Sequence, residues 1–459
     1  MYHCYSNDFF FVCIAIIVLL STRFSEATTP RASTAATTTS IVNEKEDANI
    51  HSYDQDVISV ETGTPFVIWD TQDTKCNDYH KPLDLPDVPA RAFVDNRNVT
   101  HLITADTTSW ISYGPSILDV TRNCTIAYNA TFDPQPEKYA ADEFIDATYS
   151  FGNGTVVGLL HTEYPGMNFQ NCHADKPSYP KCWMVSIGMA VSSDWGYSWH
   201  HVRPPPHHLV ASVPYKYDPS GTNLAYGWGD TSGIVRNPRD GYFYVAMMNR
   251  NRIGLQSNGT CVMRTKTLLE PKSWRGWNGS DFSVSFMNPY DDRDDENHKS
   301  DGDDDKSNIE NHVCTVLDSL PPNCNMLGVT YSTYLRQFVG SLWCPFTHQG
   351  NVSPRHEFLF TTSYDMIHWS PAQTMFDPFH EEHHNPHLQN AAYPTLMDVN
   401  APIHPRNDMN FETIGQQATL FYVQITHNFF KEGRQLMGVN VTFHNRKVSH
   451  SNTESVTRN

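Results

Sequence analysis

Four acidic side chains stand next to predicted β-strands, where several strands can bring them together. These residues are Asp87, Asp146, Glu163 and Asp230. Two carboxyl groups that face one reacting bond can divide the work, one as general acid and the other as base or nucleophile. The sequence therefore predicts carboxylate acid–base catalysis with Asp87 and Glu163 as the main pair, and with Asp146 or Asp230 assisting.

Glu163 has the most informative surroundings of the four, because it lies in the segment HTEYPG at 161–166. The neighbouring imidazole of His161 can tune the proton affinity of its carboxyl group. Other strand ends supply cationic and aromatic side chains that can hold a substrate. These candidates are Arg91, His161, Tyr164, Arg250 and Tyr393. A structural interpretation stays open for some residues, since Asp87 could cap a turn in LDLPDVPA, and His161 and Tyr164 could be ordinary strand-end residues.

The segment HEEHH at 380–384 matches H-E-x-x-H, a pattern that binds catalytic zinc when a helix places both histidines on one face. Here Pro378 precedes the segment, Pro386 follows it, and the segment has no apolar face. We therefore expect a solvated loop and not a zinc-binding helix. We predict no cofactor and leave a structural calcium ion open.

The elements that must position these residues are short apolar strands in pairs. Five segments read strand, polar turn, strand, at 90–105, 144–161, 232–248, 326–343 and 394–399 with 414–425. Their strands are rich in Val, Ile, Tyr and Phe, and their turns contain Gly, Asn or Asp. This pattern is typical of antiparallel β structure, and no amphipathic helix of a dozen residues stands out.

A second element follows three of these hairpins and consists of an apolar strand, a turn with Ser or Thr, and then Trp. It occurs at 189–199, 262–274 and 358–369. In the first of these, Ser192 and Asp194 can bond the backbone of their own turn, and Trp199 can fold back as an apolar plug. Five repeats of a unit of roughly four strands predict an all-β fold, a five-bladed β-propeller, with six blades as the alternative.

Propeller geometry sorts the acidic residues between two faces. Ligands bind where innermost strands begin and second strands end, because the blades converge there. The four carboxylates named first fall on this face by their positions in the strand pattern, with Glu143 as the alternative to Asp146. Asp95 and Asp240 lie on first hairpin turns and Asp194 on a late turn. We therefore expect these three on the opposite face, in structural roles.

Two of the late turns resemble known motifs. SSDWGYSW at 192–199 resembles the Asp box of sialidase-type propellers, and SYDMIHW at 363–369 resembles its glycine-less relative in the five-bladed glycoside hydrolases of families 32 and 43. The resemblance covers most of 64–445 as architecture. It is specific for the fold and only weakly specific for an activity, since Asp boxes also occur in propellers that are not enzymes.

The resemblance to the five-bladed hydrolases implies one catalytic acid in each of the first three blades, in the order Asp, Asp, Glu. Asp87 fits the first position, and Asp146 can fill the second. The third blade offers Asp230 but no Glu, which departs from the family pattern. Glu163, from a neighbouring loop, is the available substitute for the missing Glu.

The N-terminus and the cysteines indicate an exported protein. Residues 9–20, FFFVCIAIIVLL, have the length of a signal-peptide core, and FSEA at 24–27 suits cleavage, although no Lys or Arg precedes the core. Eight N-x-S/T sequons lie at Asn98, Asn123, Asn129, Asn153, Asn258, Asn278, Asn351 and Asn440. Eight cysteines follow the signal, which indicates disulfides, with Cys172–Cys182 as the expected local pair.

The net charge of the chain argues against one class of binding partner. The formal net charge of −18 argues against binding to nucleic acid. Part of it lies in the acidic run at 291–305, expected to be a solvated loop because it lacks EF-hand spacing. The predicted domains are a signal peptide at 1–27, a Thr/Ser-rich linker at 28–63, a β-propeller at 64–445 with an acidic disordered insertion near 291–308, and a polar tail at 446–459.

These expectations combine into one function and two alternatives. The sequence predicts a secreted protein that hydrolyses glycosidic bonds in an extracellular glycan or polysaccharide, with no cytosolic partner. A propeller that binds a glycan or a protein without catalysis is the first alternative, favoured by the missing third-blade Glu. A polysaccharide lyase with His161 or Tyr164 as base is the weaker one. An uncleaved segment 9–20 would instead make a type II membrane anchor with a lumenal or extracellular domain.

Overall fold

The computed structural model describes most of the chain that the sequence assigns to the propeller. The described residues are 57–71, 76, 86–104, 106–291, 309–321, 323–345, 357–380, 388, 390–403, 407–426 and 433–446. The expected signal peptide, most of the linker, most of the acidic insertion, the polar tail beyond Arg446 and the HEEHH segment beyond His380 lie outside them.

The described part is almost wholly β, which confirms the predicted fold class. Its helical turns are three short 3-10 helices, η1 (Pro136–Lys138), η2 (Pro271–Ser273) and η3 (Ile309–His312). None of the helices in the described ranges is long and apolar enough to cross a membrane.

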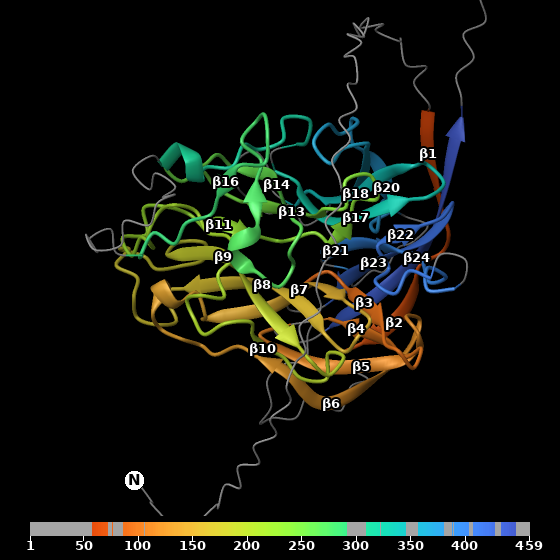
Figure 1. Cartoon of the computed structure of the whole chain (residues 1–459), viewed down its shortest axis with the longest axis horizontal. Helices are drawn as coiled ribbons and strands as arrows, with labels where there is room; N and C mark the ends of the chain where they lie inside the picture. The colour runs from red at the N-terminus through yellow and green to blue at the C-terminus, as the bar shows by residue number, and fades with distance from the viewer. Residues whose placement is uncertain are drawn as a thin grey trace, which may run out of the picture. The chain divides into compact units, whose positions relative to one another are not determined.

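Antiparallel groups of strands follow one another in chain order, coloured from orange to blue in Figure 1. The first group contains β3 (Arg91–Val94), β4 (Thr100–Ile103), β5 (Thr108–Ser116) and β6 (Asp119–Asn129). The second contains β7 (Asp142–Ser150), β8 (Val156–Pro165), β9 (Trp183–Ser192) and β10 (His200–His201). The third contains β12 (Val235–Arg236), β13 (Phe243–Asn249), β14 (Gly259–Thr265), β15 (Arg275–Gly276) and β16 (Val284–Ser285).

The fourth and fifth groups follow the same plan. The fourth contains β17 (Asn325–Ser332), β18 (Gln337–Trp343), β19 (Phe358–Ser363) and β20 (Gln373–Phe376), and the fifth contains β21 (Asn390–Met397), β23 (Gln417–Ile425) and β24 (Arg434–Arg446). Two short strands run parallel to a neighbour. β11 (Tyr226–Gly229) pairs with β9 and also with β13, and β22 (Thr413–Ile414) pairs with β17.

The first strands of the described chain complete the fifth group. β1 (Val57–Thr62) and β2 (Phe66–Asp70) both pair with β24, antiparallel to it. β1 therefore lies within the segment 28–63 that the sequence assigns to the linker. The segment VISVET forms a strand because Ile58 is buried against the fourth and fifth groups, while Val57 faces solvent.

Apolar clusters join each group to the next, as a propeller requires. Phe93 and Ile145 belong to one cluster between the first and second groups, and Val339 and Leu420 to one between the fourth and fifth. Clusters of the same kind join the second to the third group and the third to the fourth. A further cluster joins the fifth group back to the first, so the sequence of groups closes on itself.

One buried guanidinium lies where the innermost strands of all the groups meet. Arg91, on β3, donates hydrogen bonds to the carbonyl oxygens of Asp146 (2.8 Å), Thr231 (3.0 Å) and Leu327 (2.8 Å), and to Oγ1 of Thr395 (3.1 Å). These acceptors come from the other four groups or from the turns that precede them. Arg91 therefore ties the groups together at the centre of the propeller.

The late turn at 192–199 has the predicted structural role. Oδ1 of Asp194 accepts hydrogen bonds from Ser192 Oγ and Ser198 N, and Trp199 Nε1 donates to the Gly196 carbonyl. The register of β8 with β9 puts Val156 opposite Ser192, so this turn lies about 23 Å from Glu163 at the other end of β8. Asp95 and Asp240 also accept hydrogen bonds from the backbone of their own turns.

Four disulfides link eight cysteines of the described part. They are Cys76–Cys124, Cys172–Cys182, Cys261–Cys314 and Cys324–Cys344. The local pair Cys172–Cys182 is the one that the sequence predicted. The other three join segments 20 to 53 residues apart, and the spacing alone does not specify them.

Candidate active site

Seven of the nine residues predicted for the site line one pocket between the first, second, third and fifth groups. The lining residues are Asp87, Val88, Pro89, Phe144, Asp146, His161, Glu163, Asp230, Arg250 and Tyr393. The pocket has a volume of about 50 Å³, enough for a few water molecules. An edge of a ligand can enter it, while the rest of the ligand must lie on the rim.

Asp146 is the most deeply buried carboxylate of this pocket. It sits at an irregularity of β7, where the register with β8 shifts between Ile145 and Ala147, and such bulges re-aim a side chain. Its Oδ2 accepts hydrogen bonds from Thr231 N (2.6 Å) and Oγ1 (2.7 Å), whereas Oδ1 has no partner among the described residues. Burial raises the pKa of Asp146, despite the opposing charge of Arg91.

His161 and Glu163 are two residues apart on β8 and form a hydrogen-bonded pair. Nε2 of His161 lies 3.0 Å from Oε1 of Glu163, and the backbone N–H of Asp230 donates to Nδ1 of His161 at 3.0 Å. Since Nδ1 accepts, Nε2 carries the proton and donates it toward Glu163. Burial lowers the pKa of His161, but the carboxylates of Glu163 and Asp230 more than offset burial and raise it.

Asp230 holds Arg250 rather than standing free. Its two oxygens accept hydrogen bonds from Arg250 Nε and Nη2, both at 2.8 Å, and Asn325 Nδ2 donates to Oδ2. Burial alone would raise the pKa of Asp230, and Arg250 holds it below the usual range. Asp230 has a φ of 48° and Tyr393 one of 61°, so two non-glycine residues of the pocket adopt the left-handed conformation that strained functional sites often contain.

Asp87, just before β3, faces the fifth group. Its Oδ1 accepts a hydrogen bond from the hydroxyl of Tyr393 at 2.9 Å and is paired with Nη1 of Arg434. The Arg434 side chain is almost fully buried, whereas that of Asp87 is 28% exposed. Asp87 is therefore held in place by two donors while part of it stays open to the pocket mouth.

Sequence reasoning missed two acidic neighbours of the pocket and the arginine that holds Asp87. Burial raises the pKa of Asp106 to about 7, with a contribution from the charge of Asp87. Burial likewise raises the pKa of Asp142 to about 7, with a contribution from Glu163. Asp142 lies directly opposite Glu163 in the β7–β8 register, so strand pairing alone could have found it.

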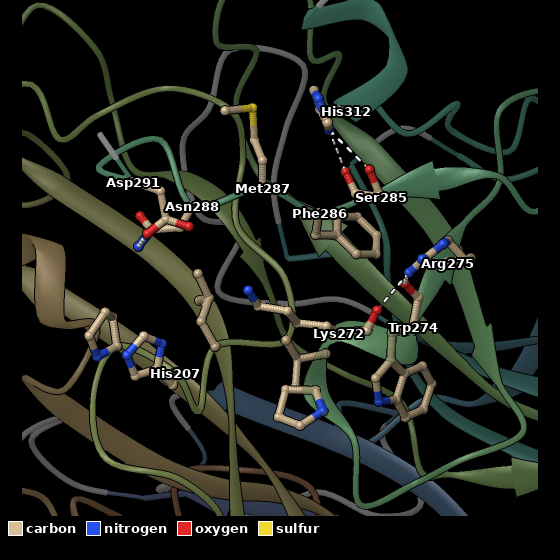
Figure 2. Close-up of a pocket in the computed structure, with 14 residues that line it drawn as sticks. His207, Lys272, Trp274, Arg275, Ser285, Phe286, Met287, Asn288, Asp291 and His312 are labelled. Atoms are coloured by element: carbon tan, nitrogen blue, oxygen red, sulfur yellow. Dashed lines mark hydrogen bonds between the residues drawn. The ribbon is translucent and has the colours of Figure 1, made fainter. Parts of the chain in front are cut away.

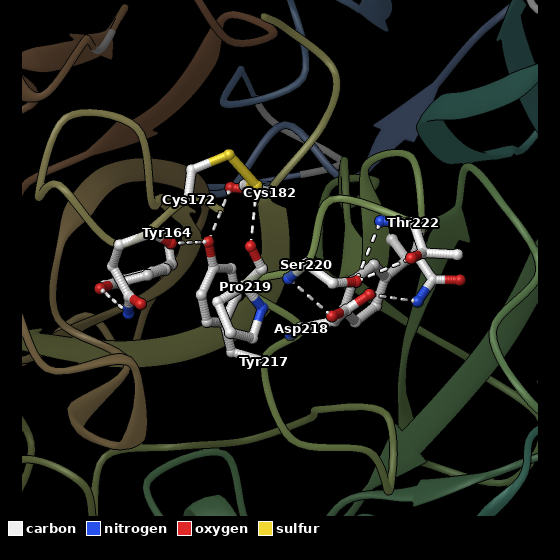
Figure 3. Close-up of a disulfide and its surroundings, with 11 residues drawn as sticks. Tyr164, Cys172, Cys182, Tyr217, Asp218, Pro219, Ser220 and Thr222 are labelled. Atoms are coloured by element: carbon white, nitrogen blue, oxygen red, sulfur yellow. Dashed lines mark hydrogen bonds between the residues drawn. A yellow bond between two sulfur atoms is a disulfide. The ribbon is translucent and has the colours of Figure 1, made fainter. Parts of the chain in front are cut away.

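Two predicted ligand-binding residues do not line the pocket. Arg91 uses its guanidinium for the contacts at the centre of the propeller described above. Tyr164 points away from Glu163, and its hydroxyl donates to the carbonyl of Pro134 and accepts from Asn171. Figure 3 shows Tyr164 and Tyr217 beside the Cys172–Cys182 disulfide, where Tyr164 packs on Tyr217. Neither Arg91 nor Tyr164 is therefore among the residues that we propose to contact a ligand.

A larger pocket, of about 240 Å³, lies elsewhere on the second and third groups (Figure 2). His207, Lys272 and Trp274 are among its lining residues, and Asp291 is the one carboxylate in its described lining. Hydrolysis by paired carboxyl groups needs two of them at one bond. The pocket of Figure 2 lacks such a pair in its described lining. The smaller carboxylate pocket holds four of the predicted acids and is the candidate active site.

The comparisons with known proteins bear on the fold alone. No family model matches the chain, and no curated protein matches it in sequence. It is similar to a solved glycosyl hydrolase from Bacteroides ovatus, with 10% identity, 78% of this chain and 84% of that chain covered, and a TM-score of 0.41. It is also similar to a family 117 glycoside hydrolase from Zobellia galactanivorans, with 8% identity, 84% of this chain and 90% of that chain covered, and a TM-score of 0.41. A third similar structure is an arabinanase from Bacillus subtilis, with 10% identity, 77% of this chain and 94% of that chain covered, and a TM-score of 0.39. At such low identities and TM-scores, a function must be argued from the pocket itself.

Proposed function

We propose that the protein hydrolyses glycosidic bonds of an extracellular glycan in the carboxylate pocket. The observation that carries this proposal is the pairing of His161 with Glu163 in the same small pocket as Asp87. Glu163 is bonded to a titratable imidazole and Asp87 to Arg434 and Tyr393, so two carboxyl groups in different surroundings face one pocket. A glycosidase needs this division between an acid and a base or nucleophile.

Glu163 is the proposed general acid. In its protonated form Glu163 gives its own carboxyl proton to the leaving-group oxygen, and the Nε2–H of His161 holds the carboxylate that remains. The backbone N–H of Asp230 fixes the orientation of the imidazole ring. Asp230 is accordingly a positioning residue, since its own carboxylate is engaged by Arg250.

Asp87 is the proposed base or nucleophile, and Asp146 assists. Asp87 accepts two hydrogen bonds that aim its carboxylate, and it is the more exposed of the two. Asp146 lies at the pocket floor with a raised pKa and one unpartnered oxygen, so in its protonated form it can donate to a sugar hydroxyl.

An aromatic rim next to the pocket offers a surface for a sugar ring. Tyr179 is 52% exposed, accepts a hydrogen bond from Arg250 Nη1, and packs edge-on against Trp183 with ring centroids 5.0 Å apart. Amphipathic aromatic side chains of this kind present an apolar face next to a polar group. The rim therefore supplies the contact area that the small pocket lacks.

The test is release of sugar from a panel of plant, algal and animal glycans by the full chain, secreted from eukaryotic cells. Glu163→Gln and Asp87→Asn are expected to lower the rate by a factor of roughly 10² to 10⁴, because each removes an acid–base group. Chromatography of the released sugars measures the rate. Asp318→Asn, an exposed site outside the pocket, is the matched control and should keep the full rate.

Some obvious variants are unsuitable, because Asp146→Asn and Asp230→Asn would each create a new N-x-S/T sequon. Asp146→Ala avoids this problem. Release that persists in both Glu163→Gln and Asp87→Asn would keep a hydrolase but reject the carboxylate pocket as its site.

A binding protein without catalysis is the second candidate function. Two observations favour it, the small volume of the pocket and the engagement of Asp230, the acid of the third group, by Arg250. If no glycan of the panel is cleaved, yet one is retained equally by the unaltered chain and by Glu163→Gln, this candidate replaces the hydrolase.

We also propose that the protein acts outside the cytosol. Disulfides persist in oxidising compartments, and four are present here. The sequon residues Asn98, Asn123 and Asn153 are exposed, as N-glycosylation requires. Secretion after cleavage near residue 27 fits both observations.

A further inference from the structure

We propose that Glu143, His201 and His208 bind one zinc ion at a site separate from the carboxylate pocket. One ligand atom from each of the three residues lies within 4.8 Å of those of the other two. The His201 nitrogen is 2.7 Å from Oε1, and the His208 nitrogen is 3.6 Å from it. None of the three residues lines the carboxylate pocket.

The spacing of these atoms suits a tetrahedral zinc ion. Zinc bonds of 2.0–2.1 Å place neighbouring ligand atoms roughly 3.3 Å apart. The two distances of 2.7 Å and 3.6 Å lie on either side of this value, so small side-chain shifts would admit the ion. Two imidazoles with one carboxylate are also a ligand set that zinc takes in proteins.

Three different segments hold the ligands in place. Glu143 lies on β7, His201 on β10, and His208 at the end of the turn that follows β10. The side chains of Glu143 and His208 are fully buried, and that of His201 is 11% exposed. The three side chains are therefore held together without an ion, and the site approaches the surface on the His201 side.

Gly188 on β9 makes room for the His208 ring. A Cβ at this position would lie 2.9 Å from Cδ2 and 3.2 Å from Nε2 of His208. Any other residue at 188 would therefore push the ring away from the cluster. The sheet provides a cradle in which Nε2 of His208 faces the carboxylate of Glu143.

Further oxygen atoms stand close enough to complete the coordination. The carbonyl oxygen of Tyr139, a residue with a φ of 53°, is 3.1 Å from Nε2 of His208. Oγ1 of Thr162 is buried without a hydrogen-bond partner among the described residues, and it lies 3.4 Å from the same Cβ position at Gly188. The fourth ligand is then the Tyr139 oxygen, or a water molecule that Thr162 binds.

A zinc ion here would clamp the 202–208 turn onto the second group. The neighbours of His208 in the chain, His207 and Leu209, line the larger pocket of Figure 2. The ion would therefore stabilise the wall of that pocket as well as the sheet. We infer a structural role, since no predicted catalytic residue is a ligand.

The test measures the zinc content and thermal stability of the full chain. Its background has His380, His383, His384 and His387 changed to Gln, which removes the histidines of the His-rich segment. After dialysis against a chelator and then against Zn²⁺, we expect one ion per chain by elemental analysis, and a rise of a few degrees in Tm. His208→Gln should weaken zinc binding at least about 100-fold.

Two neighbouring histidines provide matched controls. His200→Gln and His207→Gln each change the residue next to a ligand and should bind zinc like the background chain. Equal zinc content in His208→Gln and in the controls would overturn the proposal. So would a background chain whose Tm does not respond to zinc, which settles the matter even if His208→Gln fails to fold.

Discussion

At the scale of single residues, the protein shows what it costs to bury a charge. Burial raises the pKa of Glu412 to about 7, with a contribution from the charge of Asp408, although its carboxylate accepts a hydrogen bond from Arg236 N at 2.7 Å. The raised pKa means that the folded state favours the protonated form. Between the unfolded value of 4.5 and about 7, the folded state therefore binds more protons than the unfolded state.

Glu412→Gln is expected to change how stability depends on pH. In the unaltered chain, the contribution of Glu412 is fully present below pH 4.5 and is lost as the pH rises through about 7. Gln keeps an acceptor for Arg236 N and cannot ionise. Between pH 4 and pH 8 the variant should therefore gain about 3 kcal/mol of unfolding free energy relative to the unaltered chain. Urea unfolding at the two pH values measures this, and equal differences at both would contradict it.

At the scale of elements, the late turns are local structures that stabilise strand ends. Asp194 accepts hydrogen bonds from two serines of its own turn, and Asp365 accepts them from Ile367 N and His368 N in the equivalent turn of the fourth group. Both turns end in a buried Trp. The same sequence pattern therefore yields the same turn twice, independently of the site.

Asp194→Ala and Asp365→Ala are expected to lower the free energy of unfolding by about 1–3 kcal/mol each, since each loses several hydrogen bonds. Neither should alter sugar release or glycan retention, because the Asp194 turn lies at the opposite end of β8–β9 from Glu163. Denaturant midpoints and the glycan assay on the same samples provide the measurement. A loss of activity at unchanged stability would give these turns a functional role.

At the scale of the whole molecule, closure joins the N-terminal strands to the last one. β1 and β2 both pair with β24, and a cluster of the fifth and first groups seals the contact between the two ends of the described propeller. Arg91 adds a second link at the centre, where the innermost strands meet. The stability of the fold therefore depends on contacts between strand groups that are far apart in the sequence.

Ile58→Ala tests this closure. Ile58 is 8% exposed within a core of the fourth and fifth groups, so its truncation should cost about 2–3 kcal/mol of unfolding free energy. Val57→Ala, the neighbouring and 51% exposed position, should cost less than about 0.5 kcal/mol. Equal effects of the two substitutions on the urea midpoint would mean that β1 is not part of the folded unit.

The strands, the turns and most of the pocket follow from local patterns in the sequence. Strand alternation and turn residues are local properties, and a repeated unit of strands implies that equivalent strand ends meet on one face. That reasoning was enough to bring Asp87, Asp146, Glu163, Asp230 and three of the predicted binding residues to one pocket.

The partners of the gathered side chains, in contrast, depend on contacts between distant parts of the chain. Arg91 looked like a binding residue, but its guanidinium is satisfied by four distant groups, and Arg434 reaches Asp87 from 347 positions along the chain. The cluster of Glu143, His201 and His208 likewise has no spacing that a motif would reveal. Such contacts form only when the propeller closes and side chains from different strand groups point toward one another. No local pattern in the sequence encodes them.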